Sequence, residues 1–157
     1  MIDPRRFLPA VAIGGGAAGA VIAIPLLGDA LRCCFCIGVM AGAGASMKLW
    51  LDTHRAENLT HAEAMTLGAS SGLVSAAVTW VLSVPVRMGF GEGLAGFYAS
   101  STVLPDVARA NLQALYTPSV GMMIMALPLQ AALFGVMGAV GGFVALETAF
   151  KARKDAA

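Results

Sequence analysis

Four long stretches of almost uninterrupted apolar residues constrain the fold of this chain more than any other feature. They run over approximately residues 7–27, 33–51, 64–86 and 120–150. An α-helix rises ~1.5 Å per residue, so roughly 20 apolar residues are needed to cross ~30 Å of hydrocarbon. We therefore expect a single membrane domain, residues 1–157, built as an all-α bundle of four transmembrane helices.

The composition agrees with a membrane location. Hydrophobic residues make up 58% of the chain and charged residues 12%, with a mean hydropathy of +0.78. The chain has ten basic and nine acidic residues, so there is no excess of positive charge that would attract nucleic acid. The expected partners are the lipid bilayer, further copies of the chain or a larger membrane complex, and no cofactor is expected.

The segment between the third and fourth stretches has a different pattern. Polar residues lie largely on one side of it. The apolar residues on the other side fall at helical spacing, namely Leu104, Val107, Ala108, Leu112 and Leu115. Pro105 suits the first turn of a helix, and Phe97, Tyr98 and Tyr116 suit the depth of lipid headgroups. Residues 94–116 are thus expected to form a short interfacial helix, with a packed loop helix as the alternative.

Positive charge predicts the orientation of the bundle. In a four-span arrangement one side carries seven basic residues: Arg5, Arg6, Lys48, Arg55, Lys151, Arg153 and Lys154. The other side carries three, namely Arg32, Arg87 and Arg109. Basic residues favour the cytoplasmic side, so both termini are expected in the cytoplasm of a cell with a cytoplasmic (inner) membrane. The first stretch lacks a convincing cleavage site and is expected to stay in the protein.

Small residues at four-residue spacing occur in all four stretches. The pairs are Gly15 and Gly19, Gly38 and Gly42, Gly68 and Gly72, and Gly138 and Gly142. Apolar attraction cannot drive helices together inside lipid, so close backbone approach through small residues must do so. The pattern predicts glycine-zipper packing within a compact bundle or a tight oligomer.

Cysteines cluster at the start of the second stretch. Cys33, Cys34 and Cys36 follow Arg32 directly, yet they form no CxxC pair, and three thiolates this close on a regular helix cannot all face one ion. Structural cysteines or a bridge to another chain are the favoured interpretation. Redox or metal chemistry remains the alternative.

Three strongly polar residues lie at membrane depth and are candidate functional residues: Lys48, Gln130 and Glu147. Lys48 and Glu147 can reach the interface or pair with each other, and Gln130 can bridge helices or line a path. The loop residues His54 and His61 are expected in a solvated connector. Thr60 and Glu63 form a capping-box pattern before the third stretch.

The segments Gly14 to Leu27 and Cys33 to Gly44 resemble small uncharacterised prokaryotic multi-span membrane proteins with Gly-zipper helices. That resemblance implies location and fold, not activity. The leading functional hypothesis is a non-enzymatic structural or accessory subunit. A small oligomeric transporter or channel is the second hypothesis, and a thiol-based redox or metal-binding protein is the third.

Overall fold

The computed structural model describes residues 7–25, 27–28, 37–54, 59–116 and 119–148. Within these residues the fold is all-α, without strands. Its helices are α1 (Leu8–Ala23), α3 (Ile37–Thr53), α4 (His61–Ser100), α5 (Asp106–Tyr116) and α6 (Val120–Thr148).

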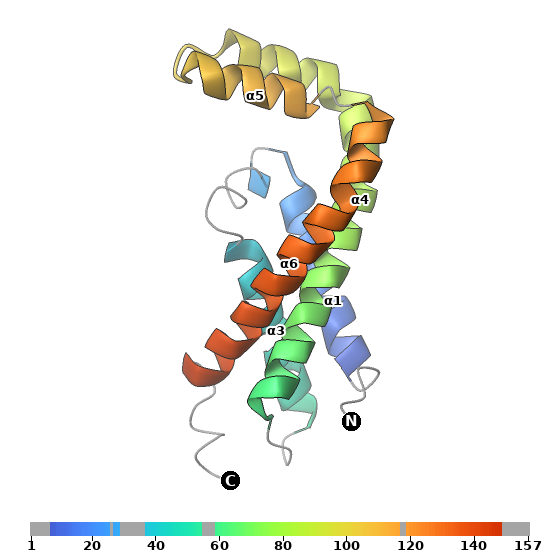
Figure 1. Cartoon of the computed structure of the whole chain (residues 1–157), viewed down its shortest axis with the longest axis vertical. Helices are drawn as coiled ribbons and strands as arrows, with labels where there is room; N and C mark the ends of the chain where they lie inside the picture. The colour runs from blue at the N-terminus through green and yellow to red at the C-terminus, as the bar shows by residue number, and fades with distance from the viewer. Residues whose placement is uncertain (1–6, 26, 29–36, 55–58, 117–118, 149–157) are drawn as a thin grey trace.

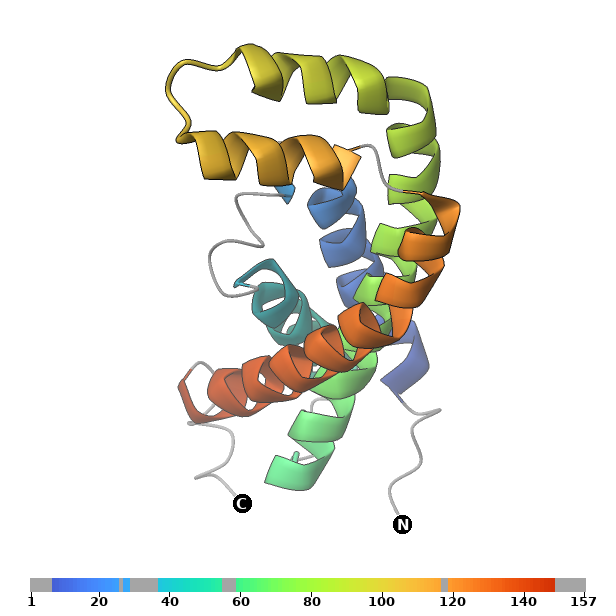
Figure 2. The same ribbon diagram turned by 45° about the horizontal axis from the view of Figure 1, so that its top comes forward.

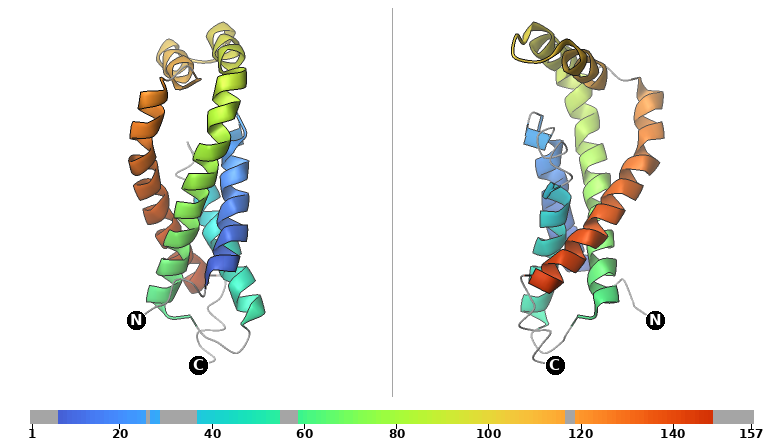
Figure 3. Two further views of the ribbon diagram at one scale, coloured as in Figure 1. Left: turned by 90° about the vertical axis from the view of Figure 1, so that its right-hand side faces the viewer. Right: turned by 60° about the vertical axis from the view of Figure 1, so that its left-hand side comes forward.

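Helices α1, α3, α6 and the first part of α4 form an antiparallel bundle (Figure 1). α1 begins, α3 ends, α4 begins and α6 ends at the same end of the bundle, which is the lower end in Figures 1 and 3. α4 is the central helix and packs against α1, α3 and α6. α3 also packs against both α1 and α6.

Helix α1 is shorter than the first apolar stretch. The expected span reached residue 27, but α1 ends at Ala23 because Ile24 adopts an extended conformation with φ −68° and ψ 123°. Ile24 precedes Pro25, whose ring disfavours helical geometry in the preceding residue. The sixteen residues of α1 correspond to about 24 Å of helix.

Helix α4 is longer than the third apolar stretch. The expected span ended at residue 86, but the helix continues to Ser100. It has 40 residues in all and contains Pro85. Figure 2 shows that α4 bends where it leaves the bundle, and its last part then runs across the bundle end. A proline inside a helix removes one backbone hydrogen bond and is a common cause of a helix kink.

The single interfacial helix expected over residues 94–116 is divided in two. The last part of α4 and α5 form a helical hairpin across the end of the bundle, connected by residues 101–105 (Figure 2). Tyr98 is buried with Ala95 inside this hairpin, against Leu94 and Leu104. Tyr98, which was expected at headgroup depth, packs with its own helix and with the connection between the two hairpin helices.

The start of α4 confirms the expected capping box. The hydroxyl of Thr60 accepts a hydrogen bond from the backbone N–H of Glu63, and the Glu63 carboxylate accepts one from the backbone N–H of Thr60. These bonds satisfy donors that the first turn of a helix leaves unpaired.

A buried cluster of larger side chains lies at the end of the bundle where α1 begins. Phe7 contacts Trp50 edge to face at 5.5 Å between ring centroids, and Trp50 stacks on His54 at 4.7 Å. Leu51, Leu67 and other residues of α3, α4 and α6 complete this cluster. Burial of these side chains fixes one end of the bundle, while the middle is packed by small residues.

Among the described residues, two helices are long and apolar enough to cross a membrane, His61–Ser100 and Gly121–Thr148. α6 contains Pro128, which cannot donate to the carbonyl four residues earlier. Five residues before Pro128, the carbonyl oxygen of Met123 accepts a hydrogen bond from the indole Nε1 of Trp80 at 3.2 Å. This bond connects α4 to the first part of α6.

Candidate functional site

Glycines make the contact where α4 crosses α6. A Cβ added to Gly68 would lie closer than 3.0 Å to the carbonyl oxygen of Gly138, and the same is true in the reverse direction. A Cβ on Gly72 would meet the carbonyl oxygen of Phe134, and one on Gly142 would meet backbone atoms of α4. The neighbours are backbone atoms, which cannot move aside by changing rotamer. Only glycine therefore fits at these four positions without separating the helices.

The contact between α1 and α4 pairs glycine with serine. A Cβ on Gly15 would lie 2.5 Å from the carbonyl oxygen of Ser71, and one on Gly19 would lie 2.6 Å from that of Ser75. The Thr79 hydroxyl donates to the carbonyl oxygen of Gly19 at 3.1 Å. Close approach thus brings a buried hydroxyl within reach of a backbone carbonyl on the neighbouring helix.

On α3, Gly42 and Ser46 face α1. A Cβ on Gly42 would lie 2.5 Å from the Ala18 methyl group, and Gly14 of α1 packs directly against Ser46. Gly38 is half-buried and lines an open groove between α1 and α3. Seven of the eight glycines singled out from the sequence thus lie at helix contacts, and Gly38 lies at the edge of one.

A row of buried hydroxyls crosses the bundle, formed by Ser46, Ser71, Ser75 and Thr79, each no more than 1% exposed. The Ser46 hydroxyl donates to the Gly42 carbonyl oxygen at 2.9 Å. It also lies 2.9 Å from the Ser71 hydroxyl, which must then be the donor between them, since each hydroxyl carries one proton. The Ser75 hydroxyl oxygen is buried with no hydrogen-bond partner among the described residues.

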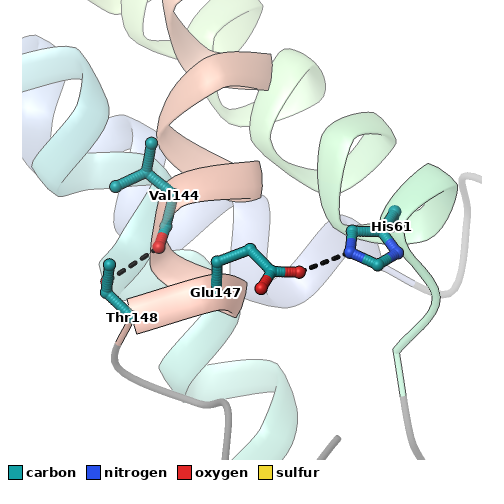
Figure 4. A network of polar contacts seen from close by, with 4 residues as sticks. All are labelled: His61, Val144, Glu147 and Thr148. Atoms are coloured by element: carbon teal, nitrogen blue, oxygen red, sulfur yellow. Dashed lines mark hydrogen bonds and ion pairs between the residues drawn. The ribbon is translucent and has the colours of Figure 1, made fainter.

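Glu147, near the end of α6, contacts His61 at the start of α4 (Figure 4). The His61 Nε2 and Glu147 Oε1 atoms are 2.5 Å apart, and the His61 ring also lies against Phe143. Both side chains are partly exposed, at 46% and 32%. His61 was expected to be only a first-turn residue of the connector. Its partner lies 86 positions away in the sequence, beyond the reach of local patterns.

The other polar candidates are separated from this contact. Lys48 is exposed on α3, and the contact of Glu147 described above is with His61. Gln130 is half-buried on α6, and its Nε2 atom is buried without a hydrogen-bond partner among the described residues. Cys33, Cys34 and Cys36 lie outside the described residues.

Within the described part of the chain, no three His, Cys, Asp or Glu side chains are grouped so that they could hold a metal ion. Comparison with protein-family models, curated proteins and solved structures gave no significant match.

Proposed function

We propose that this chain is an integral protein of the cytoplasmic membrane. In this proposal α1, α3, the first part of α4 and α6 cross the bilayer as a glycine-zipper bundle with both termini in the cytoplasm. The protein acts without catalysis, as a structural or accessory subunit that packs against a transmembrane helix of another subunit.

Two properties of the bundle support its placement in lipid. The outward faces of α4 and α6 carry large apolar side chains, among them Val81, Met125 and Leu129, with exposures of 59%, 81% and 75%. The inward faces are held by backbone contacts at glycine and by buried hydroxyls. This combination suits lipid, where helices associate through small residues and interhelical hydrogen bonds.

The fold also supports the orientation inferred from charge. Lys48 lies near the end of α3, at the bundle end where α1 begins and α6 ends. Arg87 and Arg109 lie toward the opposite end, in the bent part of α4 and in α5. The hairpin of α4 and α5 then lies across the non-cytoplasmic end, as an interfacial element would.

One observation carries the accessory-subunit proposal, namely the open groove between α1 and α3. It has a volume of about 350 Å³ and is lined almost entirely by small residues: Gly14, Ala17, Ala18, Val21, Ile37, Gly38, Ala41, Gly42 and Ala45. Gly14 and Gly42 are buried where α1 and α3 meet, whereas Ala17, Ala41 and Ala45 are exposed. An exposed surface of small residues allows a further helix to approach closely.

Substitution inside the groove tests this proposal. Ala41 is exposed and lines the groove, whereas Ala77 is exposed on α4 but does not line it. We expect the wild-type protein, purified in mild detergent, to carry a stoichiometric membrane subunit identified by native mass spectrometry. Ala41→Leu should remove this subunit and Ala77→Leu should retain it. A wild-type protein recovered only as a lone monomer would refute the proposal.

A second function, a small oligomeric transporter or channel, is favoured by Gln130 alone. A buried amide without a partner is costly at membrane depth unless another chain or a water path satisfies it. The buried hydroxyls are packed between helices of one chain, so a pore would have to form between chains. Solute or ion flux into reconstituted vesicles that Gln130→Leu abolishes would establish this function.

A thiol-based role is a third function. It would require loss of activity on replacing Cys33, Cys34 and Cys36 by serine.

A further inference from the structure

A second groove lies where α4 bends away from the bundle. It is lined by Pro25, at the end of α1, and by Val86, Gly89, Phe90, Gly93 and Leu94 of α4. Its volume is about 490 Å³, within the ~300–1,000 Å³ of small-molecule sites. Among the described residues the lining is apolar or glycine, so an occupant contacts this part of the groove through an apolar part of its structure.

Two of its glycines differ from those of the bundle. A Cβ added to Gly89 or Gly93 would meet nothing within 4 Å, whereas one on Gly68 or Gly72 would collide with backbone. Glycine inside a helix costs about 0.5–1 kcal/mol relative to alanine. No contact within the described chain requires glycine at positions 89 and 93, and their effect is to keep the groove open.

The charge beside the groove indicates which apolar molecule fits. Arg87 lies on the turn of α4 that also carries Val86 and Phe90, and Glu92 is exposed on the following turn. A guanidinium group is well suited to binding phosphate oxygens. An apolar groove beside an arginine, at the end of a membrane bundle, matches a molecule with a hydrocarbon chain and a phosphate.

We propose that this groove binds a phospholipid, with one acyl chain along Gly89 and Gly93 and the phosphate at Arg87. The proposal rests on the membrane location argued above, and it adds a specific lipid site to that location. The bound chain would fill the space between the end of α1 and the bent part of α4, and so stabilise the position of the hairpin.

The test uses the full chain in detergent micelles and a phosphatidylglycerol with a photoactivatable acyl chain. We expect saturable labelling of one lipid per chain, measured by intact mass, with the label on the bent part of α4. The double variant Gly89→Leu, Gly93→Leu should reduce labelling about tenfold, equivalent to ~1.4 kcal/mol. The matched control is Gly96→Leu, because Gly96 also has open space for a Cβ but does not line the groove.

The contribution of Arg87 is tested with a photoactivatable diacylglycerol, which lacks the phosphate. Wild-type protein should label more strongly with phosphatidylglycerol, and Arg87→Gln should label equally with both probes. Labelling that does not saturate, that survives the double variant, or that Gly96→Leu reduces equally would overturn the proposal.

A change in oligomeric state in the double variant would also overturn it, by assigning the groove to a helix of a second copy. The membrane location is measured separately, by sedimentation with alkaline-washed membranes. A wild-type protein absent from that fraction would refute the proposed function whatever the labelling shows.

Discussion

Replacing Gly68 by alanine is the most informative perturbation of the bundle. The added Cβ would lie closer than 3.0 Å to the Gly138 carbonyl oxygen, against 3.4–4 Å for an ordinary contact. α4 and α6 must therefore move apart to accommodate the added methyl group. The backbone on both sides prevents relief by a rotamer change, so the strain extends to the whole crossing.

The energies of this substitution have opposite signs. Overpacking of a well-packed contact costs about 1–3 kcal/mol, and the backbone collision places this site near the upper value. Replacing glycine by alanine in a helix contributes roughly 1 kcal/mol in the other direction. We therefore expect Gly68→Ala to lower the free energy of unfolding by about 2 kcal/mol, a factor of roughly 30 in the folding equilibrium.

The assay is reversible unfolding in mixed micelles of a mild detergent and dodecyl sulfate, followed by far-UV circular dichroism. Gly96→Ala is the control, since its Cβ would meet nothing within 4 Å, and it should leave stability unchanged or raise it by up to ~1 kcal/mol. If Gly68→Ala is as stable as the wild type, or is stabilised like Gly96→Ala, the helices do not approach through this glycine.

Three further experiments test individual contacts. A double-mutant cycle of Ser46→Ala and Ser71→Ala should give a coupling of about 0.6 kcal/mol in the same unfolding assay, typical of interhelical hydrogen bonds in membrane proteins, and strictly additive effects would exclude their hydrogen bond. Thr60→Ala should destabilise the protein by about 1 kcal/mol and speed hydrogen exchange in the first turn of α4, whereas unchanged exchange there would argue against the capping box. His61→Ala should cost less than ~1 kcal/mol because the contact with Glu147 is partly exposed, and an equal effect in the Glu147→Ala background would show that the two residues do not interact.

Hydropathy predicted where the helices lie but not where two of them end. The boundary of α1 depends on the backbone preference that Pro25 imposes on Ile24, and a hydropathy window that counts both residues as apolar does not detect it. α4 continues past Val86 because helical hydrogen bonds do not require apolar side chains. Pro85 lies inside this helix without ending it, so a proline in the sequence does not by itself mark a helix end.

The candidate site was predicted in part. Four-residue spacing identified the glycines, yet it could not show that Gly15 and Gly19 face Ser71 and Ser75 while Gly68 faces Gly138. The choice of partner depends on the crossing of whole helices. The sequence pattern of Thr60 and Glu63 was sufficient to predict the capping box, because both residues lie within one helical turn.

Sidedness of the helix connections tests the central claim, that four helices cross the membrane, most directly. Single cysteines are placed at Leu27, His54 and Thr102, in a background in which the three native cysteines are replaced by serine, and intact cells are treated with a membrane-impermeant maleimide. We expect Leu27→Cys and Thr102→Cys to be labelled in intact cells, and His54→Cys to be labelled only after the membrane is permeabilised. Labelling of Leu27→Cys only after permeabilisation, together with His54→Cys, would show that α1 and α3 do not cross, and would contradict the four-helix bundle proposed here.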